Sequence, residues 1–207
     1  MVQQHILLAS GWILFCALHS ILASPQIKQE LKKHSSHLHK YYRLYYTIFA
    51  FISLAALLYF QIRMPSLFLF EKNKIFTIAG AFIILCGSII MGICIRKYFM
   101  NLSGLKLLMT EKPQTKTLFI SGTHKYVRHP LYLGTFIFIW GLFLVYPYIS
   151  LFIANIIITL YTLYGIRLEE AKLVKEFGNA YLVYKKSVPA LIPHFKFSRG
   201  NLSRLKY

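Results

Sequence analysis

Five apolar stretches separated by basic segments constrain the fold of this chain more than any other feature of its sequence. A helix needs about 20 predominantly apolar residues to cross a bilayer, and the stretches approach that length. The fourth is short and reaches it only when Pro130 and the interfacial anchor Tyr146 are counted. We therefore predict an all-α integral membrane helix bundle, a single membrane domain over residues 1–207. Its transmembrane helices, about five in number, are expected at residues 5–23, 44–62, 75–95, 130–146 and 148–166.

Charge decides between the partners that a basic chain could have. Lys and Arg number 24 against 6 acidic residues, an excess found in proteins that meet nucleic acid or a membrane surface. Of these 24 residues, 21 lie in residues 24–43, 96–129 and 167–207. Cytosolic loops carry such an excess, so we predict an external N-terminus and a cytosolic C-terminus. Because the positive charge is spread over every cytosolic segment, we expect the lipid bilayer and no nucleic acid as partner.

Residues outside the main polar clusters favour simple interpretations. Basic residues follow the first apolar stretch rather than precede it, so we predict a retained span and not a cleaved signal peptide. The three cysteines lie inside apolar stretches, where we expect buried small hydrophobes and no disulfide framework. His34, His37 and His39 alternate with lysines, and a solvated basic loop near anionic headgroups fits them better than a metal site. In the third span, Gly80, Gly87 and Gly92 predict close helix approach.

A dense polar stretch, SGTHKYVRHPLYLG at residues 121–134, leads into the fourth apolar stretch. Polar and titratable groups at the mouth of a membrane helix are costly unless they bind something. Pro130 suits the first turn of a helix, which places His129 at the end where free N–H groups favour an anionic ligand group. We expect Arg128 and Tyr132, four residues apart, to share one face of this helix. An interfacial Arg and Tyr anchor is the alternative interpretation.

Two adjacent carboxylates, Glu169 and Glu170, lie on a helical pattern that continues past the fifth apolar stretch to Gly178, where we expect the helix to end. Adjacent helical residues point about 100° apart, so we expect the two carboxylates to do different jobs. One would face the basic connection at residues 96–129, whose polar run at 110–117 we predict to be an ordered loop over the site. That carboxylate would bind a cation or sugar hydroxyls. Solvation of the helix, or pairing with nearby lysines, is the alternative.

Taken in order, these two clusters resemble a known family. The pattern SG-x-x-x-Y-V-RHP-x-Y-x-G, a helical hairpin, and then EE-x-x-L-x-x-x-FG-x-x-Y-x-x-Y-x-x-x-VP is similar to the isoprenylcysteine carboxyl methyltransferase family of integral membrane methyltransferases, over roughly residues 118–193. At His124 the chain departs from that family, which often has an aromatic residue there. The earlier segments LHSILASPQIK and YYRLYYTIFAF are similar to NnrU-like proteins and methanethiol methyltransferases of bacteria. The resemblance implies a bacterial inner-membrane protein whose active site faces the cytosol.

The resemblance also implies S-adenosyl-L-methionine as cofactor, held at the cytosolic end by residues of about 96–130 and 167–193. It makes Arg128 and Glu170 the catalytic residues, and it implies that Glu170→Ala impairs binding of S-adenosylhomocysteine more than Glu169→Ala does. Near the end of the first span, His19 and Ser20 are our candidates for a polar pair on the substrate side. The implied cofactor-binding residues are His124, Tyr126, His129, Tyr132, Gly134, Glu169 and Glu170.

The implied reaction is methyl transfer to a lipophilic or small membrane-permeable acceptor that carries a carboxylate, thiol or amine. Such a transfer needs in-line placement of the acceptor in a dry, suitably charged pocket, and no covalent intermediate. Two alternatives stay open, an NADPH-dependent membrane reductase of related fold and a non-catalytic membrane scaffold, because a fold alone does not fix a reaction. The first three spans show only an apolar pattern, so the sequence leaves the acceptor and the oligomeric state open.

Overall fold

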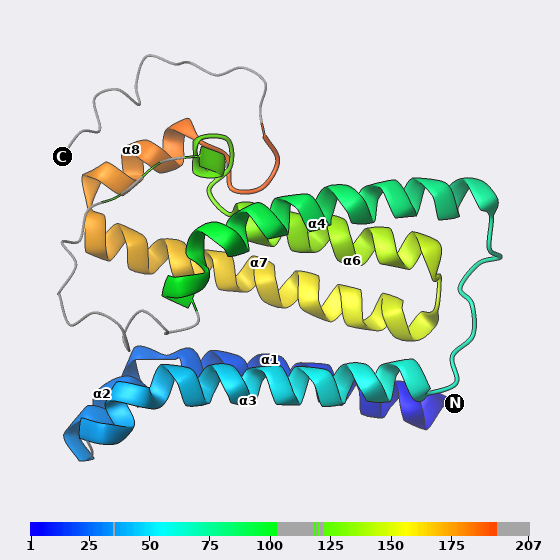
Figure 1. Cartoon of the computed structure of the whole chain (residues 1–207), viewed down its shortest axis with the longest axis horizontal. Coiled ribbons are helices and arrows are strands. Elements are labelled where there is room, and N and C mark those ends of the chain that lie inside the picture. The colour runs from blue at the N-terminus through cyan, green and yellow to red at the C-terminus, as the bar shows by residue number, and fades with distance from the viewer. Residues whose placement is uncertain (35, 103–117, 119, 121, 194–207) are drawn as a thin grey trace.

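The computed structural model describes residues 1–34, 36–102, 118, 120 and 122–193. The polar run at 110–117, predicted to be an ordered loop, lies outside this part of the chain. Within it the regular structure is helical, and one isolated antiparallel bridge joins Phe68 and Tyr148. The prediction of an all-α fold is confirmed. The helices are α1 (Val2–Ala23), α2 (Pro25–His34), α3 (Ser36–Arg63), α4 (Lys74–Leu102), η1 (Gly122–Lys125), α6 (Pro130–Val145), α7 (Ile149–Phe177) and α8 (Asn179–Ser187) (Figure 1).

Among the described residues, four helices are long and apolar enough to cross a membrane, so the chain is an integral membrane protein. The four candidate spans are Val2–Ala23, Tyr41–Arg63, Lys74–Arg96 and Ile149–Phe177. The fifth apolar helix, α6, has 16 residues and corresponds to the stretch that reads short in the sequence. The predicted membrane helix bundle is therefore confirmed, with four long spans and one shorter apolar helix. Which end of the bundle faces the cytosol stays a prediction.

Helix α7 continues beyond its apolar part into a polar C-terminal part that begins at Arg167. The helix ends where Gly178 adopts a positive φ of 55°, as the sequence predicts. Glycine adopts this conformation without the steric cost that a Cβ atom brings, and the chain turns there directly into α8. The polar end of α7 and the short helix α8 thereby lie together at one end of the bundle (Figure 1).

Helices α4 and α6 pack along their length through glycines (Figure 1). A Cβ atom built on Gly87 of α4 would lie 2.6 Å from the backbone nitrogen of Phe138, and one on Gly80 would lie 2.8 Å from the carbonyl oxygen of Gly141. Small residues allow such close approach of membrane helices, where dispersion rather than hydrophobic transfer drives association. The prediction is confirmed for Gly80 and Gly87. It is wrong for Gly92, where an added Cβ atom would have no neighbour within 4 Å among the described residues.

Helix α7 lies between the α4–α6 pair and the α1–α3 pair (Figure 1). The Asn155 side-chain amide donates to the carbonyl oxygen of Ile139 at 2.8 Å, which joins α7 to α6. On the other side, Trp12 Nε1 donates to Gln61 Oε1 at 2.8 Å, which joins α1 to α3. A bilayer interior offers no water to these polar groups, so each must find its partner within the protein. The core beside them consists of Leu8, Trp12, Met64 and Ala154.

Backbone hydrogen bonds close the end of the bundle opposite α8 (Figure 1). The Leu69 N–H donates to the carbonyl oxygen of Pro147 at 2.7 Å, and the Ile149 N–H donates to that of Leu67 at 3.0 Å. These bonds tie the connection between α3 and α4 to the turn between α6 and α7. The turn of the α6–α7 hairpin is thereby anchored at the end opposite its polar groups.

The glycine packing predicts a difference between two single substitutions in α4. We expect Gly87→Ala to destabilise the protein by about 1–3 kcal/mol relative to Gly92→Ala, because only the first new methyl group meets backbone atoms. Both variants gain helix propensity equally, so the control isolates the packing effect. The measurement is a denaturant titration in detergent micelles followed by tryptophan fluorescence. Equal stability of the two variants would contradict the close α4–α6 contact.

Candidate functional site

The segment before α6 is held by the segment after α8. Pro130 occupies the first turn of α6, and His129 precedes it as the N-cap residue. The backbone N–H groups of Arg128 and His129 donate to the carbonyl oxygens of Pro189 and Ala190 at 2.8 and 3.0 Å. The sequence motifs RHP and VP, about 60 positions apart, therefore pair directly through their backbones. This pairing fixes the backbone positions of Arg128 and His129.

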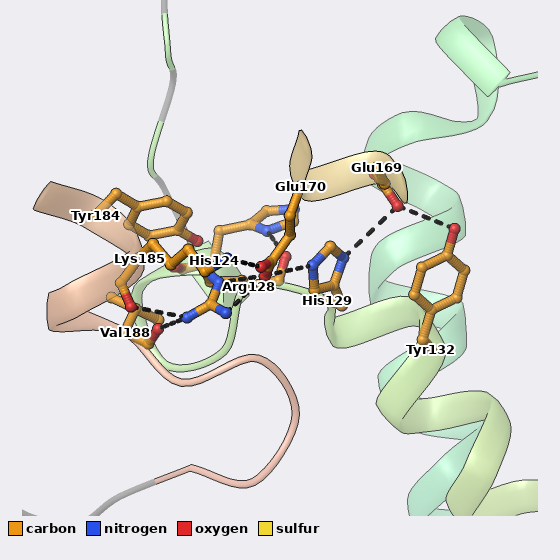
Figure 2. A network of polar contacts seen from close by, with 9 residues as sticks. All are labelled: His124, Arg128, His129, Tyr132, Glu169, Glu170, Tyr184, Lys185 and Val188. Carbon is orange, nitrogen blue, oxygen red and sulfur yellow. Dashed lines mark hydrogen bonds and ion pairs between the residues drawn. The ribbon is translucent and has the colours of Figure 1, made fainter. Parts of the chain in front are cut away.

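Arg128 and Glu170 form a buried ion pair at the centre of this region (Figure 2). The Arg128 Nε and Nη2 atoms lie 2.7 and 2.6 Å from Glu170 Oε1, and the two side chains are 8% and 7% exposed. Arg128 Nη1 donates to the carbonyl oxygen of Lys185 at 2.9 Å and also to that of Val188. A planar guanidinium can satisfy several acceptors at once in this way. Arg128 thus joins the loop before α6, helix α7 and the end of α8.

Two further side chains contact the Glu170 carboxylate. His129 Nε2 lies 3.2 Å from its Oε1 atom, and Lys185 Nζ lies 2.8 Å from its Oε2 atom. Removing a carboxylate from water costs several kcal/mol unless opposite charges and hydrogen bonds replace the water. Both oxygens of Glu170 are engaged by protein groups. The carboxylate is built into the structure rather than presented to a ligand.

Glu169 has a different environment, although it is the next residue. Its side chain is 45% exposed, its Oε2 atom accepts a hydrogen bond from the Tyr132 hydroxyl at 3.1 Å, and His129 Nδ1 lies 3.7 Å away. The His129 ring therefore lies between the two carboxylates, with one nitrogen toward each (Figure 2). It also stacks on the Tyr132 ring, with centroids 5.6 Å apart. The expectation that the two carboxylates do different jobs agrees with this difference in burial and partners.

The expected common face of Arg128 and Tyr132 is wrong. Arg128 precedes the first helical residue, Pro130, so the four-residue spacing of a helix does not apply to it. Its side chain turns toward Glu170 and the end of α8, whereas Tyr132 reaches Glu169 (Figure 2). The two residues still border the same group of carboxylates.

Three other predicted site residues lie at the edge of this cluster. His124 Nδ1 bonds with the carbonyl oxygen of Arg128 at 3.0 Å, and the carbonyl oxygen of His124 accepts a hydrogen bond from the Tyr184 hydroxyl at 2.7 Å. Tyr126 follows η1 and is 60% exposed. A Cβ atom on Gly134 would lie 2.9 Å from Met91 Cγ, so this glycine faces α4 and serves helix packing. His124 thus holds this loop through its ring nitrogen and its backbone carbonyl oxygen.

The predicted substrate-side pair, His19 and Ser20, lies on α1 near the same end of the bundle (Figure 1). The Tyr46 hydroxyl lies 2.9 Å from the His19 ring nitrogens, and Ser20 Oγ lies 2.9 Å from the Tyr161 hydroxyl. Sequence reasoning did not identify Tyr46, Tyr161 or Lys185. Two sequence signals could have identified Tyr161 and Lys185. Tyr161 lies about two helical turns before Glu169, and Lys185 lies within the Y-x-x-Y-x-x-x-VP segment.

Helix α8 packs over the ion pair through a small apolar cluster. Tyr181, Tyr184 and Val188 are buried there against Leu173, Val174 and Phe177 of α7. Burial raises the pKa of Tyr181 to about 12, and the carboxylates of Glu170 and Glu169 act in the same direction. The Tyr181 hydroxyl therefore stays protonated at neutral pH. A neutral aromatic wall covers the buried charges on this side.

In the described part of the chain, no group of three His, Cys or acidic side chains is close enough to hold a metal ion. The side chains of His37 and His39 lie outside what the structure describes. The clustered functional groups are two carboxylates, an imidazole, a phenol, a guanidinium and the ammonium group of Lys185. Such a set suits the binding of a cationic or hydroxyl-bearing organic ligand at Glu169.

Comparison with known proteins identifies related sequences. A family model described as "Protein of unknown function (DUF1295)" matches residues 25–188. The protein-S-isoprenylcysteine O-methyltransferase of Rattus norvegicus is 31% identical over 160 residues, which are 74% of this chain and 52% of that protein. The methanethiol S-methyltransferase of Crocosphaera subtropica is 38% identical over 97 residues, which are 45% and 37% of the two chains. No solved structure matches the chain significantly.

A second methanethiol enzyme, methanethiol S-methyltransferase 1 of Bradyrhizobium diazoefficiens, is 41% identical over 70 residues, which are 34% of this chain and 24% of that protein. The matched part of this chain spans about half or less of the length of these curated relatives. Their names agree with the resemblance seen in the two motifs, so the predicted relationship is confirmed.

The ion-pair geometry predicts that two conservative substitutions destabilise the protein to different degrees. We expect Glu170→Gln to destabilise the protein by about 3–5 kcal/mol, because it leaves the Arg128 guanidinium buried without its counter-charge. Glu169→Gln is the matched control, and we expect it to cost less than about 1 kcal/mol, because Glu169 is half exposed. Denaturant titration of both variants in the same detergent tests this. A Glu170→Gln variant as stable as Glu169→Gln would contradict the buried pair.

Proposed function

Because the chain belongs to the DUF1295 family of proteins of unknown function, we propose its activity from its site and its relatives: it is an integral membrane methyltransferase that uses S-adenosyl-L-methionine. The acceptor is lipophilic, or small and membrane-permeable. One observation carries the proposal, the half-exposed Glu169 carboxylate beside the stacked rings of His129 and Tyr132. The printed names of the relatives from rat, Crocosphaera and Bradyrhizobium support methyl transfer as the reaction class.

The residues present suit this cofactor. S-adenosyl-L-methionine carries a sulfonium cation, an ammonium group and ribose hydroxyls. A half-exposed carboxylate such as Glu169 can accept hydrogen bonds from an ammonium or hydroxyl group. The faces of His129 and Tyr132 are aromatic surfaces near that carboxylate, and such faces attract cations. A carboxylate without an adjoining aromatic face would suit a sulfonium ligand less well.

We assign separate roles to the neighbouring carboxylates. Glu169 contacts the ligand, and the Tyr132 hydroxyl, which donates to its Oε2 atom, keeps that carboxylate oriented. Glu170 is a positioning residue, because its contacts to Arg128, His129 and Lys185 hold the three segments around the site. This revises the expectation that Glu170 itself touches the cofactor. Its replacement by Ala would still impair binding, through loss of the arrangement that it supports.

S-adenosyl-L-methionine, when bound, supplies a methyl group on a positively charged sulfur. The chain's residues then have little covalent chemistry to perform. They hold the ligand through Glu169, limit water through the apolar α8 cluster, and leave room for an acceptor to approach in line. A thiolate or carboxylate acceptor needs no base, because the attacking atom is already deprotonated and no proton has to be removed when the new bond forms. We place this site on the cytosolic side of a bacterial inner membrane, in agreement with the charge of the loops.

Isothermal titration of the purified protein with S-adenosylhomocysteine tests the proposal. We expect the wild type to bind, and Glu169→Gln to bind about 10- to 100-fold more weakly, the effect of losing one hydrogen bond to a charged group. Glu176→Gln, an exposed carboxylate on the same helix, is the control and should bind as the wild type does.

Titration with NADP in parallel separates the alternatives. A heat of binding with NADP, and none with S-adenosylhomocysteine, would favour a membrane reductase. Absence of both signals from well-folded protein would favour a non-catalytic scaffold. Equal affinity of the Glu169→Gln and Glu176→Gln variants would contradict the role given to Glu169.

A further inference from the structure

A groove of about 380 Å³ runs between α1 and α3. Small side chains create it, since Gly11, Ala50, Ser53 and Ala56 line it together with larger apolar residues such as Leu7 and Leu14. Leu7 and Leu14 are 60% and 58% exposed in the protein alone, so this side of the groove is open to the surrounding lipid. An apolar molecule dissolved in the bilayer could enter it from the side.

The groove has one polar end. His19 and Tyr46 line it there, with the Tyr46 hydroxyl 2.9 Å from the imidazole. Ser53 is the other polar lining residue, and its hydroxyl donates to the carbonyl oxygen of Phe49 on its own helix. The other residues that line the groove are apolar. A groove with an apolar body and a single polar end is complementary to an amphiphile with one apolar chain.

The polar end of the groove is joined by side-chain contacts to the helix that carries Glu169. In the proposed cofactor site, the Tyr132 hydroxyl of α6 donates to Glu169 at 3.1 Å. Tyr161 bonds with Ser20, the neighbour of His19. These contacts join the groove end on α1 and α3 to α7, which also carries Glu169. Groove end and proposed site lie at the same end of the bundle (Figure 1).

We propose that this groove binds the apolar chain of the methyl acceptor, whose polar head lies at His19 and Tyr46. The acceptor class is then a single-chain amphiphile rather than a small thiol, and this assignment rests on the proposed methyltransferase function. From Leu7 to His19 the groove extends along about 18 Å of α1 at the usual helical rise. Its volume holds on the order of a dozen methylene-sized groups at roughly 30 Å³ each. Because lipid is as apolar as the groove, selection comes from shape and from the polar end.

Photo-crosslinking tests this with the full chain in dioleoyl phosphatidylcholine nanodiscs. The probe is dodecanoic acid with a diazirine near the chain end, and the labelled residues are found by mass spectrometry. Unlabelled dodecanoic acid, dodecylamine and dodecane-1-thiol compete, so that three head groups are covered. Ala50→Phe fills the groove, and Ala55→Phe is the control, an exposed alanine of the same helix outside the groove lining. S-adenosylhomocysteine affinity is measured on the same preparations, as is methylation of the three dodecyl compounds and of methanethiol.

We expect the probe to label groove residues of α1 and α3. The amount of label should fall at least tenfold in Ala50→Phe and change less than twofold in Ala55→Phe. Cofactor affinity should be unchanged in both, and methylation of the preferred dodecyl compound should fall with the label. Equal labelling of α4 and the groove, unaffected by Ala50→Phe, would mean ordinary bilayer lipid and overturn the proposal. Methylation of methanethiol alone would also overturn it. Groove labelling without S-adenosylhomocysteine binding would instead overturn the proposed function, and with it the identity of the occupant.

Discussion

The buried pair between Arg128 and Glu170 is the interaction on which the described polar region depends. Two charges withdrawn from water are stable only when their remaining donors and acceptors are satisfied. Here that requirement needs the carbonyl groups at the end of α8, the His129 ring and Lys185 to be in place together. Three segments that are distant in sequence are thereby held in one arrangement. The half-exposed Glu169 lies next to this arrangement, and the Tyr132 hydroxyl donates to it.

Helix α7 makes this arrangement possible because it combines two environments in one continuous element. Its apolar part packs between the two helix pairs, and its polar part carries the carboxylates beyond them. Since Tyr161 lies on the same helix as Glu169, the hydroxyls near the α1–α3 groove and the carboxylate of the proposed site are linked by a rigid connection. If α7 ended with the fifth apolar stretch, Tyr161 and Glu169 would no longer lie on one continuous helix.

The sequence predicts individual elements well because their signals are local. Apolar length indicates the spans, Pro130 indicates the start of α6, and Gly178 indicates the end of α7. What could not be predicted are the partners across long separations. The turn of Arg128 toward Glu170 depends on backbone pairing with residues after α8, and periodicity carries no information on that pairing. Periodicity likewise predicts that Gly92 could approach a neighbour, but only the packed pair shows which glycines meet α6.

The placement of charge and apolar surface bears on how a methyl group could pass between a water-soluble donor and a lipid-dissolved acceptor. Charged groups are costly within the bilayer, so a donor site must lie at the end of the helices. An acceptor with a long chain gains nothing by leaving the lipid, so it must be met from the side. The His129–Tyr132 stack lies where α6 begins, and the Tyr132 hydroxyl donates to Glu169 there. Tyrosine suits this position because its ring tolerates lipid while its hydroxyl bonds with polar groups.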